Sequence, residues 1–205
     1  MTRLRVPPGR AGRVWLRDRI ELADSALSLL EQKQAILGDR LAELRTEGER
    51  TRADWAAAAA AARIRQTRAA LLGGQWSLLL AGAGQSAELT VGSATVAGVR
   101  YPDAVQLSVP DDPSGCAATG ATTEAARAAT IAAVDAAARH AVATAAVQAV
   151  EDELTATGLR VRALRHRRIP ALHTALAELD LALEERERTE RVVPGRTDRL
   201  LEPGK

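Results

Sequence analysis

The chain has 205 residues, with 28 basic and 26 acidic side chains and a net charge of +2, so any basic surface must come from local clustering. It contains no Phe, one Tyr and three Trp, which is typical of long helices packed along their length and not of a globular core. The single cysteine, Cys116, excludes an intramolecular disulfide. The basic start has no apolar signal segment, and the longest strongly apolar run, WSLLLAGAG, is too short to span a bilayer.

The first segment has a regular apolar period. From Leu16 to Leu44 the period advances in alternating steps of four and three, with one polar member, Gln34. Its apolar members are Leu16, Ile20, Ala23, Leu27, Leu30, Leu37, Leu41 and Leu44. Alanine-rich sequence continues to about Leu72, and Gly73–Gly74 is expected to end the helix. The pattern predicts an N-terminal coiled-coil helix with a basic start in residues 1–74.

Residues 75–121 have a different pattern. β-Branched residues alternate over short distances between glycines and prolines, which predicts two or three short strands forming a hairpin, followed by a loop. Thr122 or Thr123 is a candidate N-cap for the next helix, with Glu124 in its first turn.

The third segment, residues 122–193, has a second seam with one irregular step. The seam residues are Val150, Leu154, Thr157, Val161, Leu164, Ile169, Leu172, Leu176, Leu179 and Leu183. All steps are three or four except the step of five from Leu164 to Ile169, just before Pro170. Such a skip is expected to change the supercoil locally. Residues 194–205 are predicted to be a flexible tail.

Two long helices joined by a small β insert can bury their seams only by folding back on each other. The predicted fold is therefore mainly α, a long antiparallel two-helix coiled coil with a short β-hairpin insert. Both termini are expected at one end of the coiled coil and the hairpin at the other.

The motifs of catalysis and cofactor binding are weak in this chain. GAGQSA, residues 82–87, matches a dinucleotide-binding pattern, but strand-like sequence follows it where that pattern needs a helix, so a turn is favoured. His166 and His173 lie two helical turns apart, whereas zinc ligands on one helix lie one turn apart. Ser25 and Cys116 have no adjacent base. We therefore expect no catalytic residues, no cofactor and no metal, and no enzymatic activity of the chain by itself.

Arginine is concentrated in two clusters. Residues 1–19 hold six arginines against Asp18, and residues 160–168 hold five with no acid. Such arginines can be solvated, can pair with the acids of residues 184–191, or can enter an acidic or carbonyl-lined socket. A nucleic-acid site would also need stacking aromatics or a reading motif, and neither is present.

Three stretches stand out in chain order. The first, PPGRAGRVWLRDRIELADSALSLLEQKQAIL, leads from a basic start into the leucine seam, and the second is VAGVRYPD. The third, LRVRALRHRRIPALHTALAELDLALEERERTER, includes an isoleucine–proline pair. In this order they resemble the opening helix, the hairpin element and the last helix of the D subunit, the central rotor shaft of V/A-type rotary ATPases and ATP synthases.

The resemblance implies a non-catalytic central-stalk component that couples rotation of the membrane ring to ATP synthesis or hydrolysis in the catalytic head. It implies as partners a hexamer of catalytic A and nucleotide-binding B subunits, the F subunit, and the socket subunit above the membrane ring. It also implies a cytoplasmic place, peripheral to the membrane, with no direct membrane insertion and no nucleic acid. The candidate partner contacts are Arg3, Arg5, Arg10, Arg13, Arg17, Arg165, Arg168, Val99, Arg100, Tyr101 and Pro102.

Two other functions are compatible with parts of the sequence. A generic coiled-coil adaptor or scaffold would have the seams but no need for GVRYP or for the skip at Ile169–Pro170. The presence of both features favours the rotor shaft. An arginine-rich nucleic-acid binder would show a steep salt dependence of its affinity.

Overall fold

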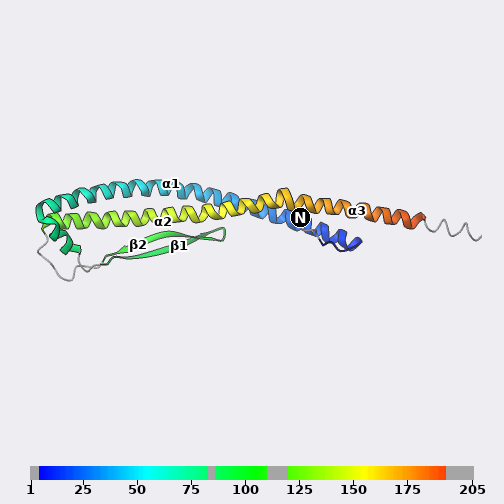
Figure 1. The fold of residues 1–205 in the computed structure, drawn as a ribbon, viewed down its shortest axis with the longest axis horizontal. Coiled ribbons are helices and arrows are strands. Elements are labelled where there is room, and N and C mark those ends of the chain that lie inside the picture. Colours follow the sequence, from blue (N-terminus) through cyan, green and yellow to red (C-terminus); the bar gives the residue numbers. More distant parts are fainter. Residues whose placement is uncertain (1–4, 83–85, 110–119, 193–205) are drawn as a thin grey trace, which may run out of the picture. The chain divides into compact units, whose positions relative to one another are not determined.

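The described part of the protein is mainly helical and contains one two-stranded sheet, as predicted (Figure 1). Its elements are α1 (Arg10–Gly82), β1 (Glu88–Val96), β2 (Val99–Ser108), α2 (Ala121–Ala163), the π-helix η1 (Leu164–Arg168) and α3 (Ile169–Val192). The computed structural model describes residues 5–82, 86–109 and 120–192, so the predicted tail lies outside the described residues. The chain forms two compact units: a terminal unit (Met1–Gln34 with Ala156–Lys205) and a hairpin unit (Ala35–Thr155).

In the terminal unit the two seams form one apolar core. Leu16 and Leu172 are fully buried, and Ala23 is buried beside them. Half-buried apolar side chains surround these three, namely Val6, Trp15, Ile20, Ile169, Ala175, Leu176 and Leu179. The core therefore consists largely of the positions that the heptad pattern selects.

Ion pairs show that the helices of the terminal unit run antiparallel. Near the start of α1, Arg10 pairs with Glu187 of α3. Further along α1, Glu31 pairs with Arg165 of η1. Because the partner's number falls as the α1 number rises, the two helices of the coiled coil point in opposite directions.

The step of five in the second seam is a π-helix. The backbone N–H of Ile169 donates to the carbonyl of Leu164, five residues earlier, which is the π-helical hydrogen bond. Pro170 follows directly and has no N–H to donate, so it cannot form the α-helical bond at this place. The predicted skip is confirmed, and its physical form is one residue inserted into a helical turn.

In the hairpin unit α1 and α2 also pack antiparallel, and the hairpin covers their seam. The core contains Leu37, Leu41, Leu44, Tyr101, Ala146 and Val150. Two polar contacts show that α1 and α2 run in opposite directions. Arg45 of α1 pairs with Glu151 at 3.0 Å, whereas Gln66, later in α1, donates a hydrogen bond to Thr130 at 2.9 Å.

The hairpin closes through a two-residue turn. Ala97 and Gly98 both have positive φ, 46° and 80°, as a type I′ turn requires. Glycine adopts this conformation freely, but alanine is strained in it.

A β-bulge interrupts the regular alternation of β2. Gly92 pairs with Ala104 and Ser93 with Pro102, so Asp103 has no opposite partner. As a result, Ala104 lies on the same face of the sheet as Tyr101, whereas regular alternation would place these two residues on opposite faces.

The hairpin lies alongside the helices of its unit (Figure 1). Ala94, Val96 and Val99, near its turn, pack against the core that contains Leu37 and Val150. The expectation that the hairpin sits at the far end of the coiled coil is therefore wrong. The apolar face of its turn end can be buried only against the flank of the helix pair, so the hairpin folds back along it.

Two helix ends differ from the sequence prediction. α2 begins at Ala121, and the carbonyl of Gly120 accepts the first bonds, from the N–H groups of Thr123 and Glu124. Gly120 therefore takes the N-cap position expected for Thr122 or Thr123. At the end of α1, Gly74 has the non-helical φ of 74°, but helical conformation resumes and continues to Gly82.

Candidate functional site

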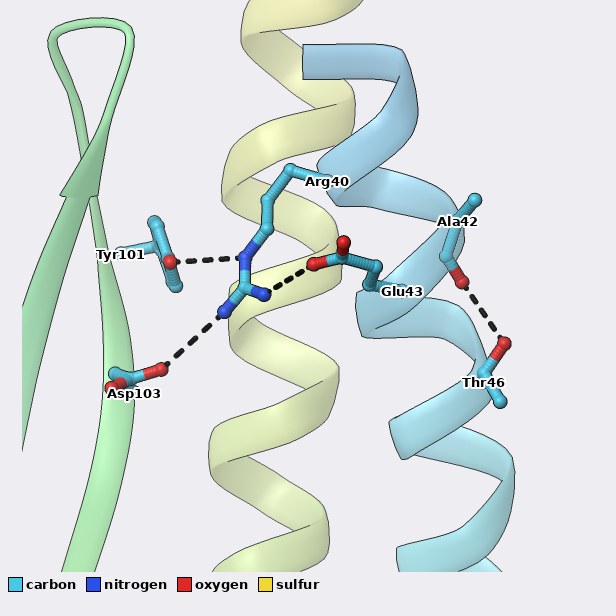
Figure 2. Close-up of polar contacts among 6 residues, drawn as sticks. All are labelled: Arg40, Ala42, Glu43, Thr46, Tyr101 and Asp103. Atoms are coloured by element: carbon cyan, nitrogen blue, oxygen red, sulfur yellow. Dashed lines mark hydrogen bonds and ion pairs between the residues drawn. The ribbon is translucent and has the colours of Figure 1, made fainter. Parts of the chain in front are cut away.

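A network around Arg40 holds the hairpin to α1 (Figure 2). The Arg40 Nε–H donates to the hydroxyl of Tyr101 at 3.1 Å, and a second guanidinium nitrogen lies 3.7 Å from an Asp103 carboxylate oxygen. The third nitrogen donates to Glu43 at 2.6 Å. These hydrogen bonds, first that to Glu43 and then that to Tyr101, raise the pKa of the Arg40 guanidinium above its ordinary value. Arg40 is thus a fixed cation that joins the helix to the hairpin.

The predicted hairpin contacts have different surroundings. Tyr101 is only 5% exposed and belongs to the core, and the Arg40 guanidinium lies 5.5 Å from the centre of its ring. Val99 and Pro102 are half-buried. Arg100 is exposed and donates a hydrogen bond to Ser93 at 2.9 Å. The structure therefore gives Tyr101 an internal role, and a partner could reach Arg100 more readily.

An apolar hollow lies between the hairpin base and α2. Its volume is about 400 Å³, and Leu107, Ile131 and Val134 are among its lining residues. On β1, Leu89 and Val91 are about half exposed, and both lie on one face because they are two residues apart. The sequence analysis did not predict the hollow or the exposed apolar face of β1. The alternating apolar residues Leu89 and Val91 were the pattern from which this face could have been predicted.

The N-terminal arginines lie against the acidic end of α3. Arg10 lies 3.2 Å from a Glu187 carboxylate oxygen, and Arg13 lies 2.9 Å from the Oδ1 of Asp180. This Oδ1 is buried and accepts no hydrogen bond from the described residues, so charge attraction holds the pair. Arg5 and Arg17 are exposed, and Arg3 lies outside the described residues.

The second arginine cluster lies at η1. Arg165, His166, Arg167 and Arg168 are all exposed. Arg165 donates to the carboxylate of Glu31 on α1. These four exposed side chains are consecutive in the chain, and Arg165 is paired with an acid across the helix pair.

The seam residues lie where the period places them. None of the large apolar seam members named above is exposed, and Leu16, Leu37 and Leu172 are among the most deeply buried of them. The seam is therefore internal.

Among the described residues, no group of three or more His, Cys, Asp or Glu side chains could hold a metal ion. His140 stacks on Trp55, with ring centroids 5.5 Å apart, and lies 3.3 Å from the Thr51 hydroxyl. His166 and His173 are both exposed. In GAGQSA, residues 83–85 lie outside the described part, and the strand β1 begins soon after at Glu88. Cys116 also lies outside it.

Each unit contains an antiparallel helix pair. The hairpin unit also carries the hairpin on the flank of its helices, and the terminal unit exposes several arginines, which fits a structural component. The family model for the D subunit of ATP synthase matches residues 14–193, and the chain belongs to this family. Its members are stalk subunits of rotary ATPases. No curated protein matches the chain. Within the described residues, no helix is both long and apolar enough to cross a membrane.

Proposed function

We propose that the chain is the central rotor subunit of a V/A-type ATP synthase or ATPase. In this role it couples rotation of a membrane ring to ATP synthesis or hydrolysis in the catalytic head, and performs no catalysis itself. The family match over residues 14–193 carries the proposal. The buried seams and the antiparallel helix pairs support it, because a rotor must transmit torque through a stiff element.

The terminal unit is the part that enters the head, a hexamer of catalytic A and nucleotide-binding B subunits. Rotation requires contacts that break and re-form, and exposed charges suit this better than a permanent apolar interface. Arg5, Arg17 and Arg168 provide exposed charges in this unit. Arg10 and Arg13 are already paired with acids of α3, and they stiffen the unit as well as facing outward.

The hairpin unit is the part that meets the F subunit and the socket subunit above the membrane ring. Its apolar hollow and the exposed Leu89 and Val91 provide surface for a lasting contact. Arg100 adds an exposed charge on the same hairpin. In this role the chain lies on the cytoplasmic side of the membrane, peripheral to it, with no contact to nucleic acid.

Purification from native membranes tests this function. With a tag on the chain, we expect the A and B subunits of the head and the F subunit of the stalk to co-purify in fixed proportion. If the chain purifies without any component of the head, the rotor function is wrong and a generic coiled-coil adaptor takes its place.

A further inference from the structure

The π-helix presents four consecutive basic side chains. In a regular seam with steps of three and four, at most three residues lie between two inward positions. The step of five between Leu164 and Ile169 leaves four, and all four are exposed. The inserted residue therefore creates a wider outward face, occupied by Arg165, His166, Arg167 and Arg168.

We call the exposed basic side chains of residues 162–168 the basic collar: Arg162, Arg165, His166, Arg167 and Arg168. From Leu154 to Ala177 the chain contains five arginines and no Asp or Glu. Across the helix pair, Arg165 of the collar pairs with Glu31 of α1. The collar thus concentrates positive charge in a chain whose net charge is only +2.

The N-terminal arginines are not separated from acids in this way. Arg10 and Arg13 pair with Glu187 and Asp180 of α3. In the same part of α3, the acids Glu184, Glu185 and Glu190 alternate with Arg186, Arg188 and Arg191. The two clusters look alike in sequence, but of the two the collar is the one with no acid in the sequence around it.

We propose that the basic collar is a docking surface for a carboxylate-rich protein surface on the catalytic head. This proposal rests on the proposed function, in which the terminal unit, which contains the collar, enters the head. The collar contains no lysine, and guanidinium groups bind carboxylates with two parallel hydrogen bonds. The contact of Arg165 with Glu31 already shows one collar arginine bound to a carboxylate.

Two other anionic partners, a nucleic acid and a membrane surface, fit less well. Residues 154–177 contain no Phe, Tyr or Trp for stacking against bases. For a membrane surface, an interfacial helix needs a broad apolar face beside its charges. In this stretch Leu159 is the one large apolar side chain that is well exposed.

The test uses the full chain and the isolated head hexamer of the same complex, stripped of its stalk. Association and dissociation rates are measured at low and at physiological salt. The variant is Arg167→Glu/Arg168→Glu. The matched control is Arg63→Glu/Arg65→Glu, a pair of exposed arginines in the hairpin unit.

We expect the collar variant to associate about 10-fold more slowly at low salt and to lose much of its salt dependence, since exposed charges act mainly on association. The control should bind like the unchanged chain. Circular dichroism checks the helix content, and if the glutamate variant does not fold, Arg167→Gln/Arg168→Gln replaces it.

Unchanged rates in a folded collar variant would overturn the proposal, while binding of the unchanged chain to the head would still support the rotor function. Failure of the unchanged chain to bind the head would overturn both. Collar-dependent binding to a short DNA duplex or to phosphatidylserine vesicles, tighter than binding to the head, would also overturn the docking proposal.

Discussion

Tyr101 connects the hairpin to the helices in two separable ways. Its ring is buried against the core that contains Leu37 and Leu41, and its hydroxyl accepts the Arg40 hydrogen bond (Figure 2). Tyr101→Phe removes the hydroxyl alone, and Tyr101→Ala removes the ring as well. Tyr101→Phe therefore measures the contribution of the hydrogen bond, and the difference between the two variants measures the contribution of ring packing.

The expected magnitudes differ clearly. The lost hydrogen bond is partly exposed, so Tyr101→Phe should cost about 1 kcal/mol. Truncation of a buried aromatic ring costs about 3 kcal/mol or more. Because a factor of ten corresponds to about 1.4 kcal/mol, opening of the hairpin should increase about fivefold in Tyr101→Phe and about 100-fold or more in Tyr101→Ala.

Hydrogen exchange of the β1 and β2 amides measures this opening. Arg100→Ala is the control on the same strand, because Arg100 is exposed, and its effect should stay within about 0.5 kcal/mol. If Tyr101→Ala leaves the exchange of these amides unchanged, the hairpin is not held by this residue. Equal effects of the Phe and Ala variants would show that the ring does not contribute.

Three further changes test other parts of the molecule. Ala97→Asn should slow hairpin exchange about fivefold, because asparagine relieves about 1 kcal/mol of left-handed strain; faster exchange would contradict the turn geometry. Deletion of His166 should restore steps of three and four and leave the melting temperature nearly unchanged, whereas deletion of the equally exposed Ala177 rotates the following helix by about 100° and should cost about 2 kcal/mol or more. Equal losses for both deletions would refute the π-helix as a single inserted residue. Deletion of residues 1–12 should keep the helix content, because Leu172 and most of its core partners remain, but weaken coupling of hydrolysis to rotation; unchanged coupling in the reconstituted enzyme would reject this role.

The helical seams could be predicted from the sequence because they depend on spacing alone. The same count located the π-helix, since a skipped register changes the apolar period itself. The place of the insertion followed from Leu164 and Ile169, without any knowledge of tertiary contacts.

The position of the hairpin could not be predicted in this way. It depends on a bulge at Asp103 and on the contact of Tyr101 with Arg40, which lie 61 residues apart in the chain.

The surroundings of the two arginine clusters also could not be predicted from the sequence. Which acids neutralise the charge of these arginines depends on the residues that the antiparallel register brings opposite them. The sequence could therefore name candidate contacts but could not rank them.

The central claim is that the chain turns within the head. A fluorescent probe attached at Arg100, exposed on the hairpin unit, reports this in single reconstituted complexes with an immobilised head. We predict stepwise rotation of the probe in one direction when ATP is added. Hydrolysis of ATP by a complete complex with a stationary probe would contradict the claim.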